Sequence, residues 1–464
     1  MRIRPVYRVL RRTFRAHAAA HEDVLARSTS PETREAFWRD FALSRVDWIV
    51  EPSSILTILK KTDRPGPLYQ WFPDAKVNMC YNAVDRHVAK RGSQIAIAYD
   101  SAVGGDSRNI TYSELLEAVE RCAGALVERG VVKGDCVLLY MPMIPEAVIA
   151  MLACARIGAV HSVVFGGFAA PELAQRIQHA EPKVVITASC GLEGASKVLA
   201  YAPLLSAALE LADHVPQTVL LHQRANLPAE LPAAPETGAA AAEGGAPAAT
   251  EWEDAAAALA AAPRAPCAAL RATDPLYILY TSGTTGQPKG IVRDNAHLVP
   301  LLWTMDHFFK CAAGETFWAA SDLGWVVGHS YICYAPLLQG CTTVLYEGKP
   351  VGTPDAGAFW RVAAQHNVTS MFTAPTALRA IRRDDPTLAL RREHKTPALR
   401  ALFVAGERAD PDTVNFFEKV SWLFVPLHFV RILLTTFDLL PGPAPPNIFA
   451  FEKALETCPV VDNW

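Results

Sequence analysis

Short apolar runs alternate with amphipathic segments along two stretches of this 464-residue chain, and this alternation restricts its fold more than any other feature. In the first stretch, residues 110–221, the apolar runs are 136–142, 159–165 and 183–188. We expect the first helix to start at Thr111, which forms a capping-box pattern with Glu114, and to end at Gly130. Apolar strands separated by helices predict an α/β fold with mainly parallel sheets covered by helices on both faces.

The second stretch, residues 271–419, repeats this rhythm and predicts a second α/β subdomain. Its expected strands are 275–283, 342–348, 368–375 and 398–407, and its expected helices are 358–367 and 376–385. Residues 222–270, between the two subdomains, are rich in Ala, Pro, Gly and Glu and predict a surface linker with a weak Ala-rich helix. Residues 36–109 are punctuated by Trp and Pro and predict a loop-rich wrapping segment.

The first 35 residues form a basic arm. Residues 1–21 carry no acid and six arginines, namely Arg2, Arg4, Arg8, Arg11, Arg12 and Arg15. An Arg-rich, acid-free, amphipathic start is typical of a mitochondrial transit peptide, although this one is poor in Ser. The alternative is a solvated basic helix of the mature protein. We therefore expect the mitochondrial matrix as the compartment, and otherwise the cytoplasm.

Composition excludes several classes of protein. A hydrophobic fraction of 51% excludes global disorder, and a net charge of −3 argues against a surface that coats nucleic acid. The ten cysteines are scattered, with no CxxC pair and no short-range His/Cys cluster. We therefore expect neither a secreted disulfide framework nor a structural zinc site, and we assign no metal ligand.

The segment YTSGTTGQPKG, residues 280–290, follows an apolar strand and has the chemistry of a phosphate-binding loop. Its glycines allow a tight turn, its hydroxyls and backbone amides can donate to phosphate oxygens, and Lys289 adds a positive charge. No Ser or Thr follows the lysine, so this is not the Walker pattern. A generic Gly/Ser/Thr turn is the alternative.

This segment resembles the phosphate loop of the adenylate-forming superfamily. The surrounding sequence resembles the short-chain acyl-CoA synthetases, the acetyl-CoA and propionyl-CoA synthetase group, in residues 71–88, 155–168, 321–338, 345–357 and 402–408. The resemblance implies the N-terminal domain of such an enzyme, built from two α/β subdomains. It also implies two half-reactions: a carboxylic acid attacks the α-phosphate of ATP with Mg²⁺ to give acyl-AMP and pyrophosphate, and the thiol of CoA then displaces AMP.

The resemblance implies a role for each matching residue. Phosphate contacts are expected from Thr281, Ser282, Gly283, Thr284, Thr285, Gly286 and Lys289. The acyl pocket is expected from Trp325, Val326, Val327 and Ala405, and the AMP contacts from Gly406, Glu407, Arg408, Asp462, Asn463 and Trp464. CoA contacts are expected from Glu193, Gly194, Ala195, Ser196, Lys197 and Val327.

Some of these positions have features of their own. Val326 and Val327 could equally be core residues of an ordinary strand and turn. In the CoA segment, where the family often has an arginine, only Lys197 is basic. At position 405 a small Ala leaves room for one methylene more than a Val would, so we expect propionate to be favoured over acetate.

The end of the chain departs from the family. Residues 420–453 form an apolar, Pro-rich insert, and without it residues 415–419 join residues 454–464 in the family's pattern. We interpret the insert as translated non-coding sequence or a mis-joined gene model. A membrane-surface segment at 420–440 is the alternative, since Pro426, His428 and Arg431 make a poor transmembrane helix. In the family the pattern continues past Trp464 into a small domain with the adenylation lysine, so we expect the chain as written to be truncated and inactive.

Three functions are compatible with these observations. The favoured one is an ATP-dependent ligase that joins propionate or acetate to CoA. The others are a non-catalytic ATP- or acyl-binding module and a protein that associates with a membrane through the insert. For the ligase we expect only small-molecule partners, namely the acid, ATP and CoA, with neither a nucleic acid nor a membrane. The sequence does not predict an oligomeric state.

Overall fold

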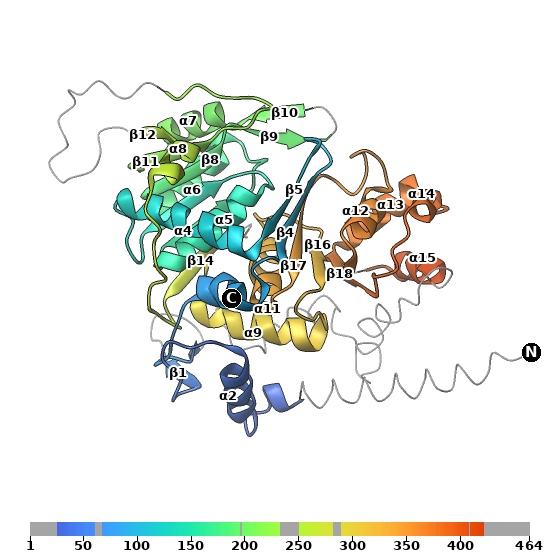
Figure 1. Cartoon of the computed structure of the whole chain (residues 1–464), viewed down its shortest axis with the longest axis horizontal. Coiled ribbons are helices and arrows are strands. Elements are labelled where there is room, and N and C mark those ends of the chain that lie inside the picture. The colour runs from blue at the N-terminus through green and yellow to red at the C-terminus, as the bar shows by residue number, and fades with distance from the viewer. Residues whose placement is uncertain are drawn as a thin grey trace, which may run out of the picture.

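The fold is known from a computed structural model, which describes residues 26–60, 67–194, 197–232, 250–281, 289–407 and 409–421. A seven-stranded and a six-stranded sheet dominate it, and helices lie between the sheets and over their outer faces (Figure 1). This confirms the mixed α/β fold predicted from the alternation of apolar and amphipathic segments.

The seven-stranded sheet has the order β12-β11-β8-β6-β7-β14-β15. Its strands are β6 (Cys136–Tyr140), β7 (Val160–Val164), β8 (Val184–Ala188), β11 (Thr218–His222), β12 (Glu251–Asp254), β14 (Pro275–Thr281) and β15 (Lys289–Asp294). The first six are parallel, and β15 pairs with β14 antiparallel at the edge. Every residue of β6, β7 and β8 is buried, which explains their continuous apolar runs.

The six-stranded sheet has the order β19-β18-β16-β17-β4-β5. Its strands are β4 (Ile95–Ser101), β5 (Asp106–Thr111), β16 (Thr316–Ala319), β17 (Thr342–Glu347), β18 (Val368–Thr373) and β19 (Ala401–Val404). All neighbours are parallel except β4 and β5, which form an antiparallel hairpin.

Three clusters of buried side chains hold the helices on these sheets. Helices α6 (Ala170–Ala180) and α7 (Tyr201–Leu211) pack on one face of the seven-stranded sheet. Helices α12 (Ala358–Gln365), α13 (Pro375–Asp384) and α15 (Pro411–Ser421) pack on the outer face of the six-stranded sheet. The largest cluster joins both sheets through α4 (Tyr112–Glu128), α5 (Pro145–Ile157), α9 (Leu298–Trp303) and α11 (Ala335–Gln339).

The remaining elements are short. The helices and helical turns are α2 (Arg34–Arg45), η1 (Tyr81–Asp85), α3 (Arg86–Arg91), α8 (Ala255–Ala261), η2 (Asn295–His297), η3 (Thr304–Phe308), α10 (Val326–Gly328), η4 (His329–Tyr334) and α14 (Ala389–Glu393). The strands are β1 (Leu56–Lys60), β2 (Pro67–Trp71), β3 (Lys76–Val77), β9 (Cys190–Glu193), β10 (Lys197–Ala200) and β13 (Leu270–Arg271). No helix in the described ranges is long and apolar enough to cross a membrane.

The predicted start of the first long helix is confirmed. Thr111 is the N-cap of α4, its side chain accepts a hydrogen bond from the backbone N–H of Glu114, and the Glu114 carboxylate accepts one from the backbone N–H of Thr111. This reciprocal pair satisfies two of the backbone donors that a helix start leaves unpaired.

The sheets do not follow the predicted boundaries along the chain. Strands β4 and β5 come from the segment 36–109, predicted to be loop-rich, yet they belong to the six-stranded sheet with residues 316–404. Conversely, β14 and β15 belong to the predicted second subdomain but complete the first sheet. The predicted linker 222–270 contains the expected Ala-rich helix, α8, but also β12, which pairs with β11. Each segment joins the sheet on which its apolar residues are buried, whatever its position in the sequence.

Candidate active site

The predicted phosphate loop is the connection of an antiparallel hairpin. Thr281, the last residue of β14, pairs with Lys289, the first residue of β15. Residues 282–288 must therefore span from one strand to its neighbour, at the edge of the seven-stranded sheet. Lys289 is exposed there. The other loop residues singled out from the sequence, Ser282, Gly283, Thr284, Thr285 and Gly286, lie outside the described residues.

Helix α6 supports the end of β14. The hydroxyl of Tyr280 and Nδ1 of His179 are 2.7 Å apart, and the guanidinium of Arg176 lies 5.6 Å from the ring of Tyr280. Arg176 also lies 4.3 Å from the ring of Phe168, within cation–π range. A second positive charge therefore lies beside the strand that leads into the phosphate loop. Sequence analysis missed Arg176, although its helix directly follows the quoted motif at 155–168.

Trp325 and the two valines after it, the residues predicted to line the acyl pocket, lie at the start of α10. Trp325 is the N-cap of α10 and is 52% exposed, and its ring lies 6.0 Å from that of Phe165. Val326 and Val327 are only half-buried, packed on the edge of the largest core cluster. Ordinary core valines would be fully buried, so the exposed parts of these side chains fit a wall that faces a ligand.

Ala405 and the residues after it form the end of the six-stranded sheet. Ala405 follows β19, is half-buried against the largest core cluster, and donates a backbone hydrogen bond to the carbonyl oxygen of Thr373 at 3.2 Å. Gly406 has φ +94°, and a Cβ built on it would meet no atom of the described residues within 4 Å. A left-handed residue beside open space lets a ligand approach the backbone closely.

Glu407 is fixed by an ion pair. Its Oε2 accepts a hydrogen bond from Nη2 of Arg379 at 2.8 Å. Burial opposes ionisation, but the hydrogen bond from Arg379 holds the pKa of Glu407 below its usual value. The carboxylate is therefore an oriented acceptor beside Gly406. Arg408, predicted to lie along the nucleotide with these two residues, is outside the described residues.

The predicted CoA segment is a second hairpin. Strands β9 and β10 pair antiparallel with Glu193 opposite Lys197, and Gly194 in the turn has φ +61°. Nζ of Lys197 donates to Oε2 of Glu193 at 3.0 Å, in an exposed ion pair. Exposed pairs of this kind are weak, so the pair holds neither side chain firmly. Ala195 and Ser196 are not among the described residues.

A glycine loop joins the CoA hairpin to the acyl wall. The loop 165–168 contacts Trp325 through Phe165, and a Cβ on Gly167 would lie 3.4 Å from Oε1 of Glu193. A Cβ on Gly166 would lie 2.0 Å from the hydroxyl oxygen of Tyr201, so there is no room for a side chain at this position. The structure thus brings Glu193 and Trp325 to the same loop, although 132 residues separate them. The sequence motif FGGF was the signal for this loop, and sequence analysis gave it no role.

A buried ion pair fixes this hairpin to the six-stranded sheet. Glu347, at the end of β17, accepts from both terminal nitrogens of Arg224 at 2.8 Å, and from the hydroxyls of Tyr99 at 2.7 Å and Ser101 at 2.8 Å. Arg224 also donates to the carbonyl oxygen of Cys190 in β9 at 3.3 Å. Both charged side chains are at least nine-tenths buried. The pair therefore links the six-stranded sheet to the base of the CoA hairpin.

Several predictions at the end of the chain fall outside the described residues. These are Asp462, Asn463, Trp464 and the insert from residue 422 onward. Helix α15 extends to Ser421, so the first two residues assigned to the insert continue a helix of the fold.

Two family models match the chain. One, described as AMP-binding enzyme, matches residues 84–425, and the other, described as acetyl-coenzyme A synthetase N-terminus, matches residues 24–83.

Similar proteins agree with these matches. Acyl-CoA synthetase short-chain family member 3, mitochondrial, of Mus musculus is 50% identical over 388 residues, which are 83% of this chain and 54% of that protein. Acetyl-coenzyme A synthetase of Bradyrhizobium diazoefficiens is 41% identical over 406 residues, 87% of this chain and 58% of that protein. Among solved structures, acetoacetyl-CoA synthetase from Streptomyces lividans matches with a TM-score of 0.73 and 25% identity, covering 88% of this chain and 59% of that one. The chain thus spans about half the length of the relatives it matches.

Proposed function

Because the chain belongs to the AMP-binding enzyme family and has an acetyl-coenzyme A synthetase N-terminus, we propose that it provides the ATP- and acid-binding part of an AMP-forming short-chain acid–CoA ligase. In the first half-reaction a carboxylate oxygen bonds to the α-phosphorus of ATP and pyrophosphate leaves. In the second, the sulfur of CoA bonds to the acyl carbon, AMP leaves, and the thiol proton goes to solvent.

The observation that carries this proposal is the pairing of Thr281 with Lys289. It fixes both ends of a loop rich in hydroxyls and glycines, with Lys289 at one end and Arg176 close to the other. Phosphoryl transfer asks an enzyme mainly for positioning and charge neutralisation, and donors fixed in advance supply both. Mg²⁺ would bind with the ATP phosphates and neutralise part of their charge.

The other predicted residues have matching roles in this proposal. The half-buried Val326, Val327 and Ala405 form the acyl wall, and the open backbone at Gly406 with the oriented carboxylate of Glu407 lies along AMP. Arg408, Asp462, Asn463 and Trp464 stay predictions for the nucleotide side. The CoA thiol approaches along Trp325 and the glycine loop. Lys197 breaks its ion pair with Glu193 and binds a phosphate of CoA instead.

We propose propionate as the preferred acid, because the small side chain of Ala405 leaves room for an extra methylene. We also propose a mitochondrial location. It is supported by the mouse relative, whose name includes that compartment, and by the basic arm at the start of the chain.

Nucleotide binding tests the proposal directly, without requiring turnover. We expect ATP with Mg²⁺ to bind the purified chain in isothermal titration calorimetry, and the double variant Gly286→Val and Lys289→Ala to weaken binding at least tenfold. Loss of one charge-assisted hydrogen bond alone is worth about that much. Lys90→Ala, a change at an exposed lysine of α3, is the matched control and should bind like the parent. Equal affinity of the double variant and the parent would refute the assignment of the loop.

A further inference from the structure

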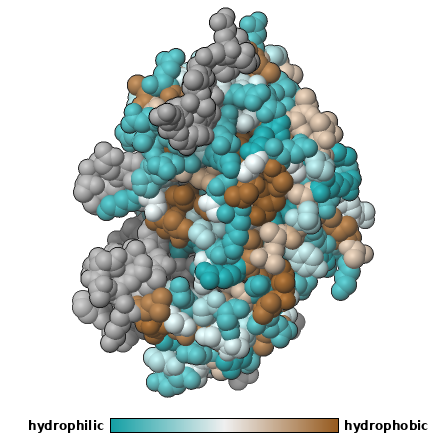
Figure 2. All heavy atoms as spheres, turned by 90° about the vertical axis from the view of Figure 1, so that its left-hand side faces the viewer, coloured by the Kyte–Doolittle hydropathy of each residue, from teal (hydrophilic) through white to brown (hydrophobic). Residues whose placement is uncertain are grey.

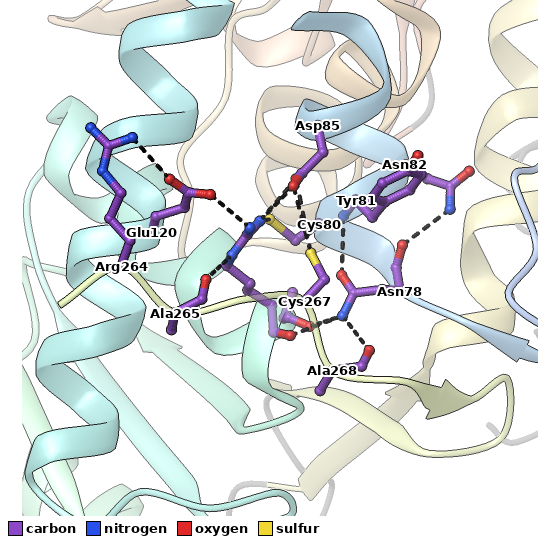
Figure 3. A network of polar contacts seen from close by, with 12 residues as sticks. Asn78, Cys80, Tyr81, Asn82, Asp85, Glu120, Arg264, Ala265, Cys267 and Ala268 are labelled. Atoms are coloured by element: carbon purple, nitrogen blue, oxygen red, sulfur yellow. Dashed lines mark hydrogen bonds and ion pairs between the residues drawn. The ribbon is translucent and has the colours of Figure 1, made fainter.

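Two cysteines and an aspartate from distant parts of the chain converge beside a buried arginine (Figure 3). One ligand atom each of Cys80, Asp85 and Cys267 lies within 4.8 Å of the other two. Sγ of Cys267 lies 3.8 Å and 3.9 Å from the two carboxylate oxygens of Asp85. Within the described ranges this is the one group of three or more His, Cys, Asp or Glu side chains with this spacing.

The backbone holds these three residues in place. Cys80 directly precedes η1, a π-helical turn, and Asp85 is its last residue; the i→i+5 hydrogen-bond pattern puts residues five apart on neighbouring turns. On the other side, Cys267 lies between Ala265 and Ala268, whose carbonyl oxygens accept from Nε of Arg156 at 2.7 Å and from Nδ2 of Asn78 at 2.9 Å. The three candidate ligand atoms are therefore held close together by backbone that is itself fixed by hydrogen bonds.

The spacing fits a tetrahedral metal ion. Zn–S bonds of about 2.3 Å and Zn–O bonds of about 2.0 Å put neighbouring ligand atoms about 3.5–3.8 Å apart. The distances from Cys267 to Asp85 lie within a few tenths of an ångström of that range, and the ligand atom of Cys80 lies within 4.8 Å of those of the other two residues. Cys80 is buried and Cys267 is half-buried, so the cluster approaches the surface on the side of Cys267.

The charges around the cluster suit a divalent ion that replaces two thiol protons. Nη1 of Arg156 donates to both oxygens of Asp85, at 3.0 Å and 2.9 Å, and Nη2 donates to Glu120 at 3.1 Å. Arg264 also pairs with Glu120, at 3.5 Å. When both thiols are neutral, the negative charges of the carboxylates of Asp85 and Glu120 cancel the positive charges of the two guanidiniums. A divalent cation bound to two thiolates leaves this balance unchanged, so no net charge is added to the buried network.

We propose that Cys80, Asp85 and Cys267 bind one soft divalent cation of the Zn²⁺ type, which ties the N-terminal segment to the segment before β13. Two thiolates select Zn²⁺ over Mg²⁺, Mn²⁺ and Ca²⁺, which prefer oxygen ligands. Each thiol must lose its proton to bind the ion. Because the ion replaces these protons, affinity rises with pH and binding releases protons.

Cobalt(II) is the probe for the site, because thiolate ligands give it a sulfur-to-metal charge-transfer absorption. We expect the full chain, stripped with a chelator and kept in a phosphine reductant, to bind about one Co²⁺ with such a band. Binding of Co²⁺ to the stripped chain should release about two protons per ion, and Zn²⁺ should then bleach the band by displacement without further proton release. Mg²⁺ in excess should leave the band unchanged.

Single substitutions assign the ligands. Cys267→Ser should weaken Co²⁺ binding at least tenfold and remove most of the band, and its half-buried position makes it the variant that folds most readily. Cys122→Ser, which changes a buried cysteine of α4 outside the cluster, is the matched control and should keep the band. Absence of the band in the parent, or its survival in Cys267→Ser, would overturn the proposal. Proton release and the bleaching by Zn²⁺ test the same claim in the unchanged protein, and neither depends on enzymatic activity.

Discussion

At the scale of single residues, Ala405 is the position where the smallest change has the most specific consequence. It is half-buried at the end of β19, beside the open backbone of Gly406. We expect Ala405→Val to fill the space of one methylene and to lower the preference for a propionyl chain over an acetyl chain. A methylene in an apolar pocket is worth about 1–3 kcal/mol, so the ratio of the two affinities should fall about tenfold or more.

Stable sulfamate analogues of propionyl-AMP and acetyl-AMP measure this ratio by binding, without turnover. Ala401→Val makes the same change of side chain at the buried start of β19, so it is the volume-matched control for a general effect on folding. The control should leave the ratio of the two affinities as it is in the parent. An unchanged ratio in Ala405→Val would show that Ala405 does not face the acyl group.

At the scale of elements, one ion pair fixes helix α12 to strand β4. Asp100 accepts from both terminal nitrogens of Arg361 at 2.8 Å, with His366 a third neighbour at 3.2 Å. Burial opposes ionisation, but the hydrogen bonds from Arg361 and His366 dominate and lower the pKa of Asp100 to about 2. A carboxylate whose pKa is lower in the folded state stabilises the fold above its unfolded pKa, and this stabilisation is lost as the pH falls through the folded value.

Protonation of Asp100 should therefore destabilise the fold in acid. Between pH 4 and pH 2 the free energy of unfolding of the parent should fall by about 2 kcal/mol more than that of Asp100→Asn, which cannot ionise. Urea unfolding at both pH values measures the two differences. Asp106→Asn, at an exposed carboxylate of β5, is the control and should follow the parent. An equal fall in parent and Asp100→Asn would contradict the role assigned to the pair.

At the scale of the whole molecule, the two sheets share one core and are also tied together by a buried ion pair. Glu347 of β17 binds Arg224, which follows β11, so the pair connects the six-stranded to the seven-stranded sheet. The surface carries apolar patches as well as polar side chains (Figure 2), but this contact lies in the interior. Removing one partner leaves the other charge buried and unpaired.

We therefore expect Glu347→Ala to lower the free energy of unfolding by about 3–5 kcal/mol in urea. Glu193→Ala, which breaks the exposed pair with Lys197, is the comparison and should cost less than about 1 kcal/mol. Because both variants remove one glutamate, net charge does not explain a difference between them. Similar losses in the two would show that the buried pair does not hold the sheets together.

The sequence by itself determined the features that depend on neighbours along the chain. The capping box of Thr111 and Glu114 needs residues three apart, and the strands β6, β7 and β8 follow from runs of apolar side chains. The proposed phosphate loop was predictable because all of its groups lie in one segment of eleven residues. Short-range patterns of this kind restrict the backbone before any tertiary contact forms.

Only the tertiary structure decided which segments share a sheet or a site. Residues 95–101 lie in the segment predicted to be loop-rich, and their pairing with β17 makes them strand β4 of the six-stranded sheet. The same holds for Arg224 with Glu347, and for Cys80 with Cys267, where the sequence showed scattered cysteines and no metal ligands. Contacts between residues more than a hundred positions apart depend on how whole helices and sheets bury their apolar faces, and no local spacing encodes that.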